Sequence, residues 1–286
     1  MKRLSEVVSE QQAMQSVVGL TDVFEGLASM RLAQVKDQVL SSQHFFNELW
    51  DIYSQVRTSN QFHYGRGLDK PPLDKELYIA ITAEGGFSGD IDQKLISWML
   101  QFYDKSKQDI IIIGHHGALQ LTQAGVEFKR YFRLPAHDNN INVEPLIAQV
   151  KLYSSTSVFY QTYITLMVQD IKRIELKRAI EDASKQASAS NKTHIKDQDY
   201  IFEPSAEIVA GHLENTMMQI TLTQTILDSK LAQYASRFRS MRRASDKAND
   251  MMHELTREYS RTKRFYADER LKEVINGLVK HEAEQA

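Results

Sequence analysis

The C-terminal third of the chain carries an unbroken heptad repeat, and this pattern limits the possible folds more than any other feature. Apolar and small residues recur at alternating steps of four and three from Leu227 to Tyr266. A period of 3.5 residues keeps one stripe of a helix facing a partner helix, so the pattern predicts a left-handed coiled coil. The seam residues that carry this prediction are Leu231, Tyr234, Phe238, Met241, Met252, Leu255 and Tyr259.

A second, less regular heptad pattern lies near the N-terminus. Its apolar positions are Leu4, Val7, Met14, Val18, Ala28, Leu32, Val35, Val39, Phe46, Leu49, Tyr53 and Val56. Gln11, Thr21 and Glu25 interrupt the apolar sequence of this stripe. Gly19 and Gly26 lie beside it, and we expect them to permit close approach of a partner helix, because glycine has no Cβ.

Proline divides the chain into three parts, because all five prolines lie between residues 71 and 204. Long proline-free stretches rich in good helix formers predict long helices. We therefore expect a helix over 1–60, an α/β globular domain over 71–204 and a helix over 205–286. At 1.5 Å per residue, helical residues 2–57 would be roughly 84 Å long and helical residues 205–280 roughly 114 Å. The first enters the central domain and the second leaves it, so we expect them to pair antiparallel.

The central part alternates strand and helix signals. Residues 77–82 predict a strand, 90–103 an amphipathic helix and 109–113 a second strand, which together form a βαβ unit with parallel strands. Further expected elements are strands at 127–132 and 157–169, a helix at 145–153, a strand or helix at 172–180, a polar loop at 183–194 and a strand at 200–202. The predicted fold class is α/β, with a long antiparallel coiled coil flanking a Rossmann-like βαβ domain.

Composition excludes several classes of site. The 35 Lys and Arg residues nearly balance the 37 Asp and Glu residues, so no global field would hold nucleic acid or an acidic membrane. The absence of cysteine excludes disulfides, thiolate metal sites and cysteine nucleophiles, and it fits a reducing compartment. No apolar run approaches the ~20 residues of a membrane span. The first residues lack the apolar core of a signal peptide, so we expect a soluble, intracellular protein.

The turn at 84–89 (EGGFSG) follows a strand and precedes a helix, where anions can bind exposed N–H groups. Its glycine spacing fits neither the Walker loop nor the dinucleotide fingerprint, which favours a tight turn over a nucleotide site. Ser88 lacks both an evident base and the esterase motif.

The adjacent histidines and the basic run have structural explanations. His115 and His116 are adjacent at a strand end, which favours solvated loop residues over metal ligands. The basic run at 237–243 lies around the heptad seam, so its arginines are expected to form a solvated or protein-facing stripe and not a nucleic-acid site. The sequence predicts no catalytic, metal or cofactor site.

At the residue level the chain resembles the gamma subunit of F-type ATP synthases, the rotor of the central stalk. Residues 20–31 (LTDVFEGLASMR) are similar to the family's I-T-x-A-M-x-M-V-A-A-x-K, and 81–89 (ITAEGGFSG) to its strand and S-[DS]-x-G-L-C-G turn. Residues 202–205 (FEPS) look like the Y-E-P that opens the last helix. Residues 241–248 (MRRASDKA) match M-[KR]-x-A-[TS]-x-N-A, and 255–261 match L-x-x-x-Y-N-[KR].

The resemblance implies a non-catalytic rotor that couples ion flow through a membrane c-ring to ATP synthesis or hydrolysis in an alpha/beta hexamer. Implied partners are the alpha and beta subunits, the epsilon subunit and the c-ring, with membrane contact only through that ring. The implied location is peripheral, at the cytoplasmic face of a bacterial membrane. By the match, the beta-subunit lever would contact Phe24, Leu27, Met30 and Arg31. The bearing and catch loops of the upper hexamer would contact Lys263, Arg264, Asp268 and Glu269.

The terminal segment departs from the family pattern. In residues 267–277 only Glu273, Val274, Ile275 and Gly277 keep the character of the family's I-T-Q-E-I-x-E-I-V-x-G. We therefore hypothesise a divergent paralogue that serves an alternative rotary ATPase. A non-enzymatic coiled-coil scaffold or adaptor in another complex is the alternative, since it explains the heptads equally well.

Overall fold

The computed structural model describes residues 3–56, 73–135, 141–180, 203 and 206–285. The chain divides into two compact units. The helix-pair unit consists of Met1–Leu27 and Arg239–Ala286, and the sheet unit consists of Ala28–Phe238. Helices α1 (Leu4–Val56) and α6 (Ala206–Gln285) each contribute to both units. The predicted loop at 183–194 and strand at 200–202 lie outside the described residues.

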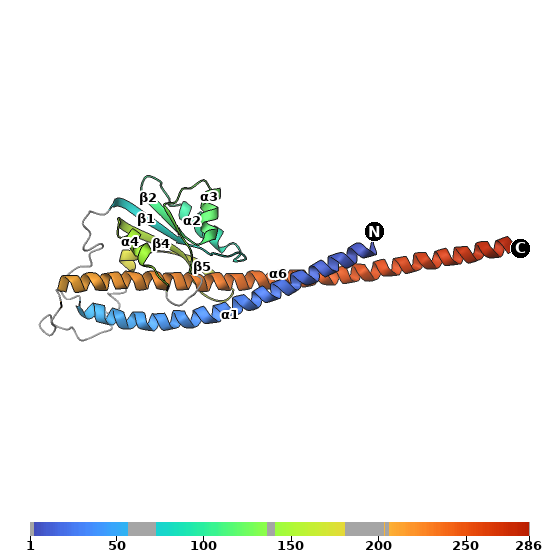
Figure 1. The fold of residues 1–286 in the computed structure, drawn as a ribbon, viewed down its shortest axis with the longest axis horizontal. Helices are drawn as coiled ribbons and strands as arrows, with labels where there is room; N and C mark the ends of the chain where they lie inside the picture. The colour runs from blue at the N-terminus through green and yellow to red at the C-terminus, as the bar shows by residue number, and fades with distance from the viewer. Residues whose placement is uncertain (1–2, 57–72, 136–140, 181–202, 204–205, 286) are drawn as a thin grey trace. The chain divides into compact units, whose positions relative to one another are not determined.

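The sheet unit is built on five strands in the order β3-β2-β1-β4-β5 (Figure 1). The strands are β1 (Leu73–Ile81), β2 (Gln108–Ile113), β3 (Arg130–Phe132), β4 (Tyr153–Tyr163) and β5 (Gln169–Glu175). The first four are mutually parallel, and β5 runs antiparallel to β4. Helix α2 (Ile91–Leu100) connects β1 to β2, which confirms the predicted βαβ unit.

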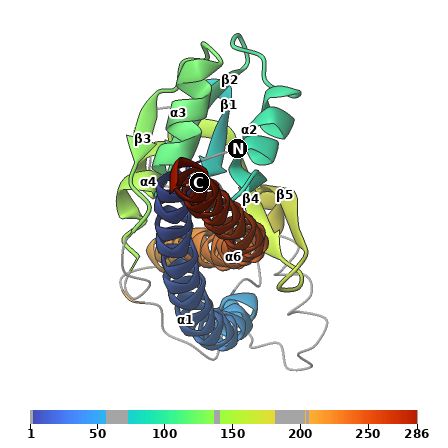
Figure 2. The ribbon, with the colours of Figure 1, turned by 90° about the vertical axis from the view of Figure 1, so that its right-hand side faces the viewer.

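Alternation along the strands gives the sheet two apolar faces. Tyr78, Ala80 and Ile112 pack on one face with α2 and with α3 (His115–Gln123). Leu77, Ile79 and Ile111 pack on the other face with α1, α6 and α4 (Glu144–Val150) (Figure 2). The predicted fold class is confirmed, and both long helices are present.

Several predicted element bounds were wrong. The strand expected at 127–132 is reduced to Arg130–Phe132, and β4 ends at Tyr163 because residues 164–168 form a tight turn. In that turn the Val168 N–H donates to both the carbonyl and the hydroxyl oxygen of Thr165. The segment 172–180 contains both alternatives, with the end of β5 followed by helical residues 176–180. Helix α3 was not predicted.

The helix-pair unit buries small and apolar residues along one side of α6. In α6, Met241, Ala248 and Thr262 are buried, whereas the residues between seam positions are mostly exposed. Val7 and Thr21 of α1 are buried in the same unit. The expectation for Gly19 and Gly26 was wrong, because a Cβ placed on either meets nothing within 4 Å. Close helix approach therefore does not require glycine there.

Candidate functional site: the sheet crevice, the helix seam and the α6 tip

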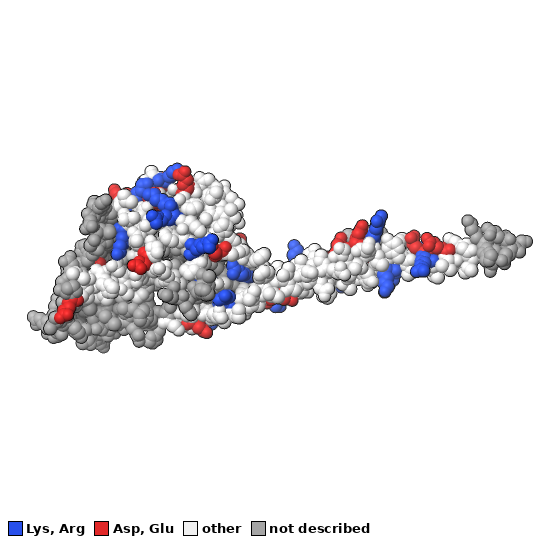
Figure 3. Space-filling model, viewed as in Figure 1, with Lys and Arg blue, Asp and Glu red and all other residues white. Residues whose placement is uncertain are grey.

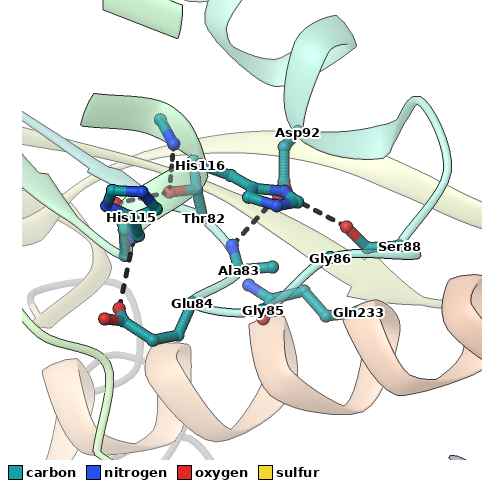
Figure 4. A network of polar contacts seen from close by, with 12 residues as sticks. Thr82, Ala83, Glu84, Gly85, Gly86, Ser88, Asp92, His115, His116 and Gln233 are labelled. Carbon is teal, nitrogen blue, oxygen red and sulfur yellow. Dashed lines mark hydrogen bonds and ion pairs between the residues drawn. The ribbon is translucent and has the colours of Figure 1, made fainter. Parts of the chain in front are cut away.

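The carboxyl ends of β1 and β4 define the place where a doubly wound sheet usually binds a ligand. From β1 the chain proceeds to β2 and β3 on one side and then returns to β4 on the other, so a topological switch point lies between β1 and β4. Ligands of such folds bind outside the carboxyl ends of the strands at this point. Here the same place holds a buried polar network that includes side chains from α6 (Figure 4).

Asp92, in the first turn of α2, is the centre of this network and is 1% exposed. Its Oδ1 accepts hydrogen bonds from the Ala83 N–H at 3.2 Å and from Gln161 Nε2 at 2.8 Å. Its Oδ2 accepts one from the Ser88 hydroxyl at 3.1 Å and lies 3.1 Å from His116 Nδ1. A buried carboxylate is tolerated only when its oxygens are satisfied, and four partners from three segments, the β1–α2 connection, β4 and α3, meet that need.

Helix α6 closes the network from the other side. The Ser229 hydroxyl donates to Gln161 Oε1, and Gln233 Nε2 reaches the same oxygen at 3.3 Å and the Ser229 oxygen at 3.0 Å. All three residues are buried. Gln161, near the carboxyl end of β4, thus connects the carboxylate of Asp92 to the long helix. The α6 side chains occupy the position that a ligand takes in related sheet folds.

One helical turn further along α6, two side chains hold the turn at 84–89. The Ser236 hydroxyl donates to the Ser88 carbonyl at 2.7 Å. The Arg237 guanidinium donates to the Gly86 carbonyl at 3.0 Å and to the Gly85 carbonyl at 3.1 Å. Burial lowers the pKa of Arg237. We expected this arginine in a solvated or protein-facing stripe. Instead, its guanidinium binds the 84–89 turn of the same chain.

This turn therefore presents its carbonyls to a cation, which is the opposite of a phosphate-binding loop that presents N–H groups. Phe87, at the tip, has a positive φ of 68° and an exposed ring. A non-glycine residue in that region is strained, and it persists because the surrounding bonds fix the turn. The geometry favours the tight-turn interpretation over the nucleotide alternative.

The two adjacent histidines are not loop residues, so that prediction was wrong. Both begin α3, and the N–H of His115 donates to Glu84 Oε2 at 3.2 Å. The carboxylate of Glu84 therefore accepts from a free N–H group at the N-terminus of α3, where an external anion could otherwise bind. His116 is only partly exposed, and its hydrogen bond to Asp92 raises the pKa of its imidazole. Among the residues that the structure describes, no group of three His, Cys, Asp or Glu side chains could hold a metal ion.

Charged side chains give no sign of a nucleic-acid surface on the visible face. Figure 3 shows basic and acidic residues interspersed there over the strands and helices. Within the described part of the chain, no helix is both long and apolar enough to cross a membrane.

Three polar pairs set the register of the helix-pair unit. Gln11 Nε2 donates to Thr256 Oγ1 at 3.2 Å, and Ser245 Oγ donates to Asp22 Oδ1 at 2.7 Å. The pairs are equally spaced on the two helices in opposite directions, since 11 residues separate both members. This confirms the antiparallel pairing. The third pair, Glu25 with Arg242 at 3.2 Å, keeps the same register. Two of the polar interruptions of the N-terminal heptads, Gln11 and Glu25, therefore have specific partners on α6, whereas the Thr21 hydroxyl donates to carbonyls of its own helix.

By this register, Leu4 at the start of α1 lies opposite Lys263, and α6 continues to Gln285 without α1 beside it. The next seam position, Tyr266, is exposed. Five apolar residues follow at the spacing of one helix face, and they are 49–60% exposed: Leu271, Val274, Ile275, Leu278 and Val279. We call residues 264–285 the α6 tip. Lys263, Arg264, Asp268 and Glu269 lie at its base and are exposed.

The predicted lever contacts lie along α1. In the helix-pair unit Phe24 is half-buried and Leu27 is exposed. In the sheet unit Met30 is exposed, and the exposed Arg31 donates to Gln34 Oε1 at 3.3 Å. Leu20 and Val23 are also exposed, on the side of the helix away from the seam. Sequence reasoning did not single out these two residues, although their spacing from Leu27 signals one helix face.

Sequence reasoning also missed Asp92, Gln161 and Gln233 as members of a site. A signal existed for Gln161, a polar residue inside a strand of β-branched and aromatic residues. Its partners lie 69 and 72 residues away in the chain, which a local pattern cannot reveal.

Comparisons with known proteins give this arrangement a family. A family model described as ATP synthase matches residues 3–279. The ATP synthase gamma chain of Staphylococcus saprophyticus is 22% identical, over 98% of this chain and 99% of that protein. The gamma chain of Clostridium novyi is 20% identical, over 96% and 95%.

Solved structures agree in fold. A chain of the Euglena gracilis mitochondrial ATP synthase, described as OSCP/F1/c-ring, has a TM-score of 0.59 at 13% identity and covers 95% of this chain and 97% of its own. A chain of the central stalk and c-ring of the Tetrahymena thermophila enzyme has a TM-score of 0.57 at 16% identity, with 79% and 99% covered. This chain belongs to the ATP synthase gamma family, the non-catalytic subunit that forms the central stalk of rotary F-type ATP synthases.

Proposed function

We propose that this chain is the rotor that couples ion flow through a membrane c-ring to ATP synthesis or hydrolysis in an alpha/beta hexamer. The observation that carries the proposal is the family match over residues 3–279. One neighbour of known structure comes from an assembly described as OSCP/F1/c-ring, and another from one described as central stalk and c-ring. A rotor acts by contacting the states of its partners unequally, because a contact that is equal in all states shifts no equilibrium.

The α6 tip is proposed to lie inside the hexamer. Its apolar stripe is larger than the scattered exposed apolar residues that are normal on a protein surface, and such a stripe favours a partner. Lys263, Arg264, Asp268 and Glu269, at the base of the tip, are the proposed contacts with the bearing and catch loops. They carry both charge signs on adjacent helical turns, so each can pair with a different loop as the shaft turns.

The beta-subunit lever is proposed to contact the outer side of α1. Leu20, Val23 and Leu27 form an exposed apolar stripe within the helix-pair unit, and Phe24 lies beside it. Met30 and Arg31, further along the same helix, complete the proposed contact. An apolar stripe that an amphipathic helix can cover fits a helical lever.

The sheet unit is proposed to meet the epsilon subunit and the c-ring. The turn between β4 and β5 exposes Ile164, Met167 and Val168, which is the largest group of adjacent exposed apolar residues in the described part of this unit. The c-ring would attach the chain to the cytoplasmic face of a bacterial membrane as a peripheral protein.

The test is purification of the tagged full-length chain from its host, followed by native mass spectrometry and an ATPase assay. We expect alpha- and beta-type subunits at one copy of this chain per hexamer. Removal of residues 267–286 should abolish coupled ATPase activity, whereas removal of 280–286, which spares the apolar stripe, serves as the matched control. Recovery of the chain with partners that have no ATPase activity would contradict the proposal and favour the scaffold alternative.

The paralogue hypothesis needs a separate test. A strain that lacks its ordinary gamma subunit should not recover full ATP synthesis when it expresses this chain, if the altered tip serves a different hexamer. Full complementation would exclude the hypothesis.

A further inference from the structure

Within the sheet unit, α6 is buried on two opposite sides. One side carries Leu227 and Leu231, which pack in the apolar core with Val35 of α1. The other side carries Ser229, Gln233, Ser236 and Arg237, which enter the crevice between β1 and β4. Steps of four, three and one along the chain keep these four on one side, at about 100° per residue.

The two sides restrain the helix differently. Apolar packing is non-directional, so it resists withdrawal of the helix more than rotation about the helix axis. Hydrogen bonds weaken steeply when their geometry changes, so they resist rotation. The crevice therefore supplies the directional contacts of this helix with the sheet.

The crevice partners come from two separate segments. Gln161 on β4 receives Ser229 and Gln233, and the 84–89 turn after β1 receives Ser236 and Arg237. Asp92 connects the two segments through Gln161 and the Ser88 hydroxyl. A helix held at one point could pivot, whereas one held by two segments that are themselves joined has a fixed angle.

Arg237 is positioned for this role. Its two donors reach two successive carbonyls, and its guanidinium lies 5.6 Å from the centre of the Tyr234 ring. A planar fork can hold two acceptors at once, which a lysine ammonium does less well.

We propose that the ligand crevice of this sheet has become a socket for the shaft, and that Arg237 and Gln233 are positioning residues that lock α6 in rotational register with the sheet unit. The inference rests on the proposed rotor function. Torque that arrives at the sheet unit from the c-ring passes into α6 through these directional bonds, and torque from the hexamer passes back the same way.

The experiment uses the complete membrane complex in inverted vesicles. ATP hydrolysis and ATP-driven membrane potential are measured on the same vesicles, the potential with an oxonol dye that responds to either coupling ion. The variants are Arg237→Met, Arg237→Lys and Gln233→Met. Arg243→Met is the matched control, because Arg243 is an exposed residue of the same helix outside the crevice.

For Arg237→Met we expect the potential generated per ATP hydrolysed to fall by about twofold or more, because the loss of both bonds to the Gly85 and Gly86 carbonyls leaves fewer directional contacts to oppose rotation of the helix. Gln233→Met should lower the ratio in the same direction. Arg237→Lys should give an intermediate value, and Arg243→Met should leave the ratio unchanged. A purely structural defect would lower assembly, hydrolysis and potential together and leave the ratio per assembled complex intact.

Hydrogen exchange on the assembled complex provides a second measurement. In Arg237→Met, amides of residues 82–90 should exchange about tenfold faster, while those of β2 keep their protection. An unchanged ratio with intact assembly would overturn the socket proposal while leaving the rotor function standing. Failure of the unaltered chain to support any ATP-driven potential would instead overturn the proposed function.

Discussion

The buried carboxylate of Asp92 gives the sharpest stability prediction. Asp92→Ala removes the acceptor of four hydrogen bonds and leaves two buried donors, the Ala83 N–H and Gln161 Nε2, without it. Each unsatisfied buried donor costs about 1–3 kcal/mol, and the bonds from Ser88 and His116 add about 1 kcal/mol each. Relief of the desolvated charge offsets part of this loss. We therefore expect the free energy of unfolding of the sheet unit to fall by about 3–5 kcal/mol.

The assay is urea unfolding followed by tryptophan fluorescence in a Trp50→Phe background. This leaves Trp98, whose ring lies 5.7 Å from Phe159 on the face covered by α2. The matched control is Asp90→Ala, because Asp90 makes an exposed ion pair with Lys94 and should change stability by less than about 1 kcal/mol. If Asp92→Ala unfolds within about 1 kcal/mol of the unaltered chain, the carboxylate does not organise the crevice and the reasoning is wrong.

Three further predictions concern other parts of the structure. Gly114→Ala should lower the free energy of unfolding, measured in urea, by about 3 kcal/mol or more, because φ is +96° and the new Cβ would lie 2.0 Å from the Thr82 carbonyl oxygen. The control is Gly86→Ala, whose Cβ meets nothing within 4 Å and which should cost less than about 1 kcal/mol. Burial raises the pKa of Asp228 from 3.8 to about 6, so its contribution to stability is complete below about pH 4 and is lost as the pH rises through 6. We therefore compare the free energy of unfolding of Asp228→Asn with that of the unaltered chain in urea. The difference in favour of the variant should be about 1 kcal/mol larger at pH 8 than at pH 5, and an equal difference at both pH values would contradict the raised pKa. Ala248→Leu overpacks a buried seam position and should lower stability by about 1–3 kcal/mol in thermal unfolding followed by circular dichroism, whereas a rise would show that the seam has spare room.

Local periodicity predicted the helices and an apolar stripe along each, because the residues that face a partner helix recur at a fixed spacing in the sequence. The polar interruptions at Gln11 and Glu25 could not be interpreted in the same way. Their partners, Thr256 and Arg242, are identified only once the register of two distant segments is known. The sequence therefore predicts that a coiled coil exists but not which polar residues align it.

The sheet was predictable for a similar reason, since β1 and β2 are continuous apolar runs. Helix α3 was missed because it spans only nine residues, buries few of them and begins with two histidines and a glycine nearby. The crevice was missed because Asp92, Gln161 and Gln233 are far apart in the chain, and no local pattern shows that their side chains meet. Only the return of the chain to β4 beside β1 brings them together.

The α6 tip also has a consequence for how the cell must handle this chain. While no partner covers it, the stripe from Leu271 to Val279 stays in water, and such a stripe on one chain can bind the same stripe on another. If the hexamer encloses this tip as proposed, copies made in excess of the hexamer subunits are the ones that self-associate or are degraded by proteases. Balanced synthesis of the subunits would prevent this, since binding to a partner lowers the concentration of chains that expose the apolar stripe.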